Sequence, residues 1–205
     1  MGFQTIDAIQ YFVFENLNAL DIPHGVFTRH GGVSPAPWHS LNLGGNNGDE
    51  RANVIENRKR IFKTLNRPVD PLFDVWQVHS TRVLRTDSPR LLDSEPQKAD
   101  AILTNCPEVT LFMRFADCVP VFVYDPDRQV IGLIHAGWQG TVNQISAHTI
   151  EVMVSEYGCD PKNIVAGIGP SICCQHYEVG DEVVQLVMRN LPEDSKKCLV
   201  KINGK

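Results

Sequence analysis

The chain has 205 residues, 42% hydrophobic and 21% charged, which is the balance of an ordinary globular domain with a sizeable core. Its net charge of -5 and pI of about 5.8, without a block of lysine and arginine, argue against nucleic acid or an anionic membrane as the main partner. No apolar run approaches the roughly 20 residues that span a bilayer and no secretion signal is visible, so we expect a cytoplasmic protein.

Sequence patterns in the first half of the chain predict several strands and one helix. The helix is expected over 50–65, where apolar residues recur with helical spacing before Pro68. The segment 24–34 reads as a strand that feeds a tight glycine-rich loop. Further strand-like runs lie at 11–17, 75–78, 81–84, 99–105 and 109–118.

The second half alternates strands and helices. A hairpin is expected from 115–125 and 130–137, which flank a turn signal, and a helix over 140–158 that stops at Gly158. A buried strand over 163–172, a helix over 181–191 and a strand within 198–205 complete the pattern. Without internal repeats or a linker, we predict a single α+β domain spanning 1–205.

The cysteines indicate reduced thiols. The six cysteines, of which Cys173 and Cys174 are adjacent, lack the spacing of a disulfide framework. This usage agrees with a cytoplasmic location, and nothing in the sequence indicates an obligate protein partner.

Cys118 and His135 are the most informative pair, because the expected hairpin brings them together. A two-residue loop places them directly opposite each other, and a four-residue loop makes them diagonal neighbours on one face. A three-residue loop would put them on opposite faces. Directly opposed side chains have Cβ atoms about 5 Å apart, which suits two ligands of one metal or a thiolate and its base.

A metal needs a third ligand, and His79 at the end of an apolar run is the best candidate, with His30 as its competitor. A His–Cys–His set with one open position is typical of catalytic zinc. The same set with an axial methionine would describe a blue-copper site, so copper is the alternative metal. A second interpretation makes Cys118 the nucleophile of a cysteine hydrolase or amidase and His135 its base.

Four glycine-rich turns, at 28–34, 41–49, 135–141 and 167–172, offer backbone N–H groups to an oxyanion. Arg29 flanks the first of them. By the period of two in a strand, Arg114 is expected on the same face as Cys118, where Asp117 or Asp100 could pair with it. Together these features predict a local phosphate site in an acidic protein.

Several motifs then identify the chain as resembling one family. The segments TRHGGVS, SLNLGGNNGDE, WQVHS, ADAILTN, RFADCVPVFVYDP, GLIHAGWQGT and GIGPSICCQHYEVGDEV occur in this order between about Val26 and Val183. They resemble the YfiH family, also called the laccase-domain or multicopper polyphenol oxidase family. The resemblance implies an α/β/β/α-layered fold and a metal site whose ligands match His79, Cys118 and His135.

The resemblance also implies an activity. Members of this family are regarded as zinc-dependent purine nucleoside enzymes that phosphorolyse adenosine, inosine or methylthioadenosine and deaminate adenosine, and some are credited with editing peptidoglycan precursors. The expected substrates are thus purine nucleosides and inorganic phosphate. Multicopper chemistry is not supported, because a laccase uses repeated His-x-His pairs and the 7 histidines here include none.

By the same resemblance, Arg29, Asn42 and Arg114 are candidates for holding ribose and phosphate, and His30 for the acid or base. The sequence departs from the family pattern at Gln139, where an arginine is usual, and at Cys173 and Cys174, where small residues are frequent. Family members continue beyond the point corresponding to Lys205, so we expect the 1–205 domain to lack the family's C-terminal segment.

Overall fold

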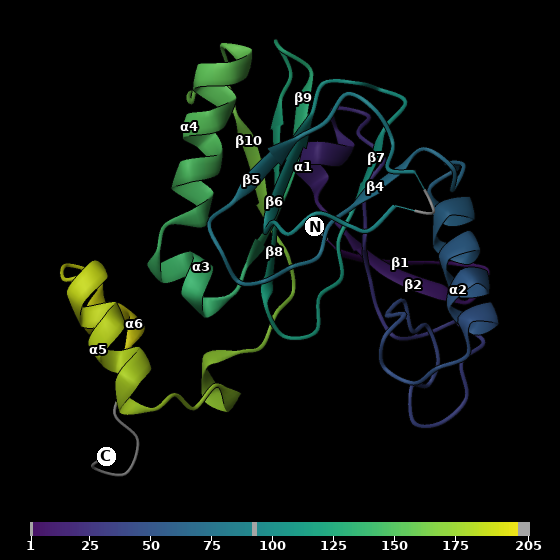
Figure 1. The fold of residues 1–205 in the computed structure, drawn as a ribbon, viewed down its shortest axis with the longest axis horizontal. Coiled ribbons are helices and arrows are strands. Elements are labelled where there is room, and N and C mark those ends of the chain that lie inside the picture. The colour runs from purple at the N-terminus through teal and green to yellow at the C-terminus, as the bar shows by residue number, and fades with distance from the viewer. Residues whose placement is uncertain (1, 92–93, 201–205) are drawn as a thin grey trace.

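The computed structural model describes residues 2–91 and 94–200, and a five-stranded sheet lies at its centre (Figure 1). The strand order is β10-β8-β9-β6-β5. The strands are β5 (Val83–Arg85), β6 (Ala101–Thr104), β8 (Val119–Asp125), β9 (Val130–Ala136) and β10 (Val165–Ile168). All neighbours are antiparallel except β5 and β6, which are parallel.

The central strands are mostly apolar because both faces of the sheet are covered. One face packs against helix α4 (Ile145–Tyr157), in a cluster that includes Leu103, Ile134 and Met153. The other face packs in a second cluster that includes Ile102 and Leu133. Strands buried on both sides lose the usual alternation of polar and apolar residues, as the sequence of β8 illustrates.

A second layer of strands lies beyond the central sheet. Strands β1 (Gly2–Ile6), β2 (Ile9–Val13) and β3 (Val26–Phe27) form one sheet, and β4 (Leu72–Asp74) pairs in parallel with β7 (Thr110–Phe112). Helix α2 (Arg51–Thr64) covers this layer at the end of the molecule opposite α4 (Figure 1). The α/β/β/α layering confirms the predicted fold class, and α2 confirms the helix expected over 50–65.

The helix expected over 140–158 is wrong in one respect, since two helices occupy that region. Helix α3 (Trp138–Val142) ends before Gln144, whose φ of 62° is left-handed and cannot continue a helix. Helix α4 then stops at Gly158, with φ of 67°, in the manner expected of a glycine cap.

Other expected boundaries also differ from the structure. The run 11–17 is not one strand, because β2 ends at Val13 and α1 (Glu15–Asn18) follows, and β1 was not predicted at all. The strand expected over 75–78 lies earlier, in β4, and the run 109–118 is strand only within β7. Cys198 belongs to helix α6 (Ser195–Cys198) rather than to a strand, and 201–205 lie outside the described residues.

The C-terminal elements leave the central sheet. After β10, the 3-10 turn η1 (Cys174–His176) leads to helix α5 (Asp181–Asn190), which contacts α3 (Figure 1). Among the described residues, no helix is long and apolar enough to cross a bilayer.

Candidate metal centre

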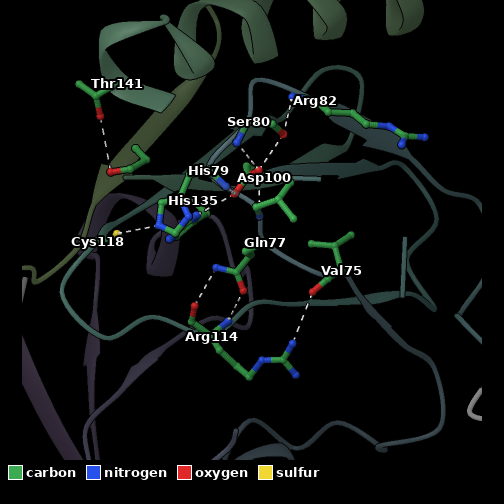
Figure 2. Close-up of polar contacts among 12 residues, drawn as sticks. Val75, Gln77, His79, Ser80, Arg82, Asp100, Arg114, Cys118, His135 and Thr141 are labelled. Carbon is green, nitrogen blue, oxygen red and sulfur yellow. Dashed lines mark hydrogen bonds and ion pairs between the residues drawn. The ribbon is translucent and has the colours of Figure 1, made fainter. Parts of the chain in front are cut away.

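His79, Cys118 and His135 meet at one end of the central sheet. One ligand atom from each lies within 4.8 Å of the other two. The Cys118 Sγ is 3.9 Å from His79 Nε2, and the two imidazole rings approach edge to face with centroids 4.9 Å apart. The three residues come from three separate segments of the chain (Figure 2).

The β8–β9 hairpin explains how Cys118 reaches His135. Asp125 pairs with Val130, so the loop has four residues, and His135 pairs with Pro120. Cys118, one residue before β8, is therefore a diagonal neighbour of His135 on the same face. The four-residue alternative is confirmed, and the directly opposed register is wrong because the turn is two residues longer than the tightest hairpin.

Asp100 fixes both histidines. Its buried carboxylate accepts hydrogen bonds from the backbone N–H groups of Val78, His79 and Ser80, from the Ser80 hydroxyl and from His135 Nδ1. These bonds hold the 78–80 segment in a tight turn in which His79 has a φ of 60° (Figure 2). From the sequence, Asp100 was predicted only as a possible partner of Arg114, because an aspartate beside a strand is usually a turn residue.

The same carboxylate sets the chemistry of His135. The Nδ1–H of His135 donates to Asp100 over 2.9 Å. The lone pair of Nε2 is therefore free to bind a metal. Burial lowers the pKa of His135, although hydrogen bonding and the negative charge of Asp100 oppose it, so the neutral ring is favoured. A neutral imidazole with a carboxylate behind it is a typical metal ligand.

The environment of Cys118 disfavours a bare thiolate. Burial raises its pKa, and the negative charges of Asp117 and Asp100 raise it further. A thiolate at this position therefore needs a cation beside it, which a divalent metal between the sulfur and two imidazoles would provide.

Gly137 leaves room for the three ligands. A Cβ at this position would lie 2.8 Å from His79 Cδ2 and 3.2 Å from Cys118 Sγ. Only glycine fits here without displacing a ligand. The sequence marked this position as part of a glycine-rich turn, but the close approach is visible only in the structure.

A cavity of about 1310 Å³ lies beside the three ligands, and Arg29, Asn42 and Arg114 all line it. The ligands themselves do not line it. Phe115 connects the two regions, since it lines the cavity and its ring centroid is 5.6 Å from that of His135.

Arg114 belongs to a group of positive charges around one buried carboxylate. Asp74 is buried and pairs with Arg90 and, over 3.6 Å, with Arg114. Arg58 lies over the Phe112 ring, and within the described part of the chain its buried Nε has no hydrogen-bond partner. Burial and the charges of Arg114 and Arg90, opposed by Asp74, lower the pKa of Arg58. Three guanidinium groups around one carboxylate leave a positive surplus that favours an anion.

The structure corrects two expectations about Arg114. Strand β7 ends at Phe112, so Arg114 and Cys118 do not share a strand face. Its partner is Asp74 rather than Asp117 or Asp100. Gln77 exchanges two hydrogen bonds with the Arg114 backbone, at 2.7 and 3.1 Å, which ties this arginine to the segment that carries His79 (Figure 2).

Comparison with known proteins decides the family. Residues 23–204 match the family described as multi-copper polyphenol oxidoreductase laccase. The chain belongs to this family, which includes the YfiH proteins. The crystal structure of the Bacillus licheniformis hypothetical protein YfiH superposes with a TM-score of 0.89 at 33% identity, over 98% of this chain and 76% of that one.

Several relatives carry a name that differs from the family description. A Deinococcus radiodurans protein named purine nucleoside phosphorylase is 41% identical over 80% of this chain and 62% of its own length. The Bacillus subtilis protein named purine nucleoside phosphorylase YlmD is 37% identical over 90% of this chain and 68% of its own. The Escherichia coli protein named purine nucleoside phosphorylase YfiH is 40% identical over 78% and 63%. The chain thus spans about two thirds of the length of these relatives.

The remaining residues that the family resemblance singles out lie in loops of the β3–α2 connection. The Arg29 Nε donates to the His39 carbonyl over 2.6 Å, while the exposed guanidinium borders the cavity. The Asn42 amide bonds Asp49 over 2.9 Å and the Gly44 N–H over 3.0 Å, and so shapes its own loop. His30 is exposed and does not belong to the three-ligand group.

Proposed function

We propose that the protein is a zinc-dependent purine nucleoside enzyme, which phosphorolyses adenosine, inosine or methylthioadenosine to the base and a pentose 1-phosphate and also deaminates adenosine. The observation that carries this proposal is the His79–Cys118–His135 group, backed by Asp100, beside a cavity that Arg29 and Arg114 line. The names of the relatives support the same reaction class.

The donor set fits zinc. One thiolate and two imidazoles, with a carboxylate behind one ring, form a three-ligand set of the kind that leaves a fourth position open. His79, Cys118 and His135 would hold the ion. When bound, zinc supplies a Lewis acid that polarises a substrate atom or lowers the pKa of a water to about 7.

Phosphorolysis requires that a phosphate oxygen bond the anomeric carbon as the bond from that carbon to the purine nitrogen breaks. The cavity arginines would bind and orient the phosphate, and Arg114 is the best placed because Asp74 and Gln77 fix both its side chain and its backbone. The departing purine needs a proton, for which His30 remains the predicted source.

The metal ligands and the arginine group lie close enough for one substrate to contact both. Asp74, at the arginine group, and His79 are five residues apart, so their Cα atoms lie at most ~17 Å apart. Phe115 lines the cavity and contacts the His135 ring, so a nucleoside in the cavity would lie beside the ligands.

The experiment follows each substrate by chromatography, with and without phosphate. Release of adenine or hypoxanthine that requires phosphate, and inosine formation that does not, would support both activities. The matched control is Cys118→Ala, which should remove bound zinc and both products together. Full turnover by a metal-free Cys118→Ala protein would reject the proposal.

One observation favours a second candidate, a cysteine amidase acting on peptidoglycan precursors or related amides. The Asp100–His135 bond resembles the pair that orients the base of a cysteine nucleophile. The raised pKa of Cys118 argues against it. Iodoacetamide separates the two, since a free nucleophile reacts at once whereas a zinc-bound sulfur reacts only after a chelator is added.

A further inference from the structure

Cys173 and His176 form a second thiol–imidazole pair outside the metal centre. The Cys173 Sγ lies 2.9 Å from His176 Nδ1, and both residues are exposed. The turn η1 creates this contact, because the His176 N–H donates to the Cys173 carbonyl and side chains three residues apart eclipse in a 3-10 turn. The pairing therefore follows from the local backbone.

An imidazole at this distance can accept the thiol proton as the sulfur attacks, as the base of a cysteine nucleophile does. Cys174 and Cys198 are also exposed, but within the described part of the chain neither sulfur has a hydrogen-bond partner. Among the described residues, one exposed thiol thus has an imidazole partner and two do not.

The segment that carries this pair is bonded to both sides of the metal ligand Cys118. The Gly169 N–H donates to the Pro120 carbonyl over 2.8 Å, and the Ile172 N–H donates to the Asp117 carbonyl over 3.1 Å. Cys173 directly follows Ile172. A group attached to Cys173 would therefore lie one residue from a backbone hydrogen bond that holds the segment carrying Cys118.

We propose that Cys173, with His176 as its proton acceptor, is a modification site for small-molecule disulfides, and that modification loosens the Cys118 loop. The thiol proton passes to His176 Nδ1, and the Cys173 sulfur attacks one sulfur of the disulfide. The original S–S bond breaks, a mixed disulfide forms on Cys173, and the released thiolate takes the proton from His176. The disulfide is the oxidant, and no other reagent is needed.

The test compares thiol reactivity in the full-length chain with glutathione disulfide as the probe and mass spectrometry as the readout. Cys174→Ser leaves Cys173 as the only thiol of the adjacent pair, and Cys173→Ser leaves Cys174. We expect Cys173 to react about tenfold faster than Cys174, with Cys198 as the internal reference. Adding His176→Gln to Cys174→Ser should remove the advantage and leave Cys198 unchanged. Equal rates at Cys173 and Cys174, or no effect of His176→Gln, would overturn the proposal.

The effect on the Cys118 loop rests on the proposed zinc site and is measured separately, as the rate of zinc transfer to a coloured chelator. We expect faster transfer from the modified Cys174→Ser protein than from the unmodified one, and no change after the same treatment of Cys173→Ser. Equal transfer rates would overturn the coupling. If the protein bound no zinc, the metal proposal would fail while the thiol rates would still decide whether Cys173 is the modification site.

Discussion

The two halves of the candidate site are built differently. At the metal centre, one buried carboxylate bonds the imidazole of His135 and the backbone N–H of His79, so these two ligands are positioned before any ion binds. On the cavity side, Arg29 and Asn42 lie in loops, and their side chains bond to other groups of the same β3–α2 connection. Arg114 is intermediate, because its backbone is fixed by Gln77 while its guanidinium is partly exposed.

This difference indicates a division of labour. A preformed ligand set binds an ion without first rearranging its side chains, and it retains that ion. A loop-based cavity can accept nucleosides that differ in the base or the ribose substituent. Changes at the metal centre should therefore abolish binding of the ion, whereas changes in the cavity should alter substrate affinity.

The largest effect is expected for Asp100→Asn. The amide cannot accept all five hydrogen bonds, so we expect zinc affinity to fall roughly 10–100-fold and the free energy of unfolding to fall by about 3 kcal/mol. Competition with a chelator and urea denaturation measure the two quantities. Asp87→Asn, at an exposed carboxylate outside the three-ligand group, is the control and should change neither much. Similar losses in both variants would refute the special role of Asp100.

Gly137→Ala tests the close packing of the ligands. The added methyl meets the His79 ring at 2.8 Å, so the ligands must move apart, and we expect a loss of about 1–3 kcal/mol in stability together with weaker zinc binding. Gly45→Ala is the matched control, because a Cβ there has no neighbour within 4 Å. Unchanged zinc affinity in Gly137→Ala would contradict the packing described for this centre.

Arg114→Gln addresses the cavity side. Removing a charge-assisted contact to phosphate should raise the KM for phosphate roughly tenfold, while zinc content stays the same. Arg82→Gln removes an exposed arginine and so controls for net charge. Steady-state kinetics at varied phosphate provides the measurement. An equal change in both variants would mean that Arg114 acts only through the overall charge.

The smallest effect is expected for Asp49, which organises the 42–49 loop. Although burial opposes it, hydrogen bonds from Asn53, Ser34, Asn42 and the Glu50 N–H hold the pKa of Asp49 at about 2. A lowered pKa means that Asp49 stabilises the fold above the pKa of about 3.9 that it has when unfolded. This stabilisation is lost as the pH falls through 2.

Asp49→Asn should therefore lower stability at pH 7 and reduce its decline between about pH 4 and pH 2. Urea denaturation at several pH values measures this, with Asp70→Asn at an exposed position as the control. A parallel acid profile in the wild type and Asp49→Asn would show that the loop carboxylate does not contribute.

The sequence predicted the parts of the site that depend on local periodicity. Cys118 and His135 followed from the period of two in a hairpin, and His79 from its place at the end of an apolar run. Asp100 and Gly137 could not be assigned their roles, because these depend on which segments come together in three dimensions.

The errors in the predicted secondary structure have a similar origin. The helix breaks at Gln144, which has a left-handed backbone conformation although it is not a glycine. The apolar pattern continues through this position, so the sequence predicted a single helix. Arg114 was expected on a strand that ends two residues earlier at Phe112, because the apolar run continues beyond the last strand pair. Element type was thus predicted better than element ends, and the error at β7 moved a candidate residue to a different partner.

The most direct test of the central claim is X-ray absorption at the metal edge of the purified protein, with total metal content measured on the same sample. We predict one zinc per chain, bound by one sulfur at about 2.3 Å and two imidazole nitrogens at about 2.0–2.1 Å, and loss of the sulfur ligand in Cys118→Ser. A zinc site without sulfur, or an unchanged site in Cys118→Ser, would contradict it.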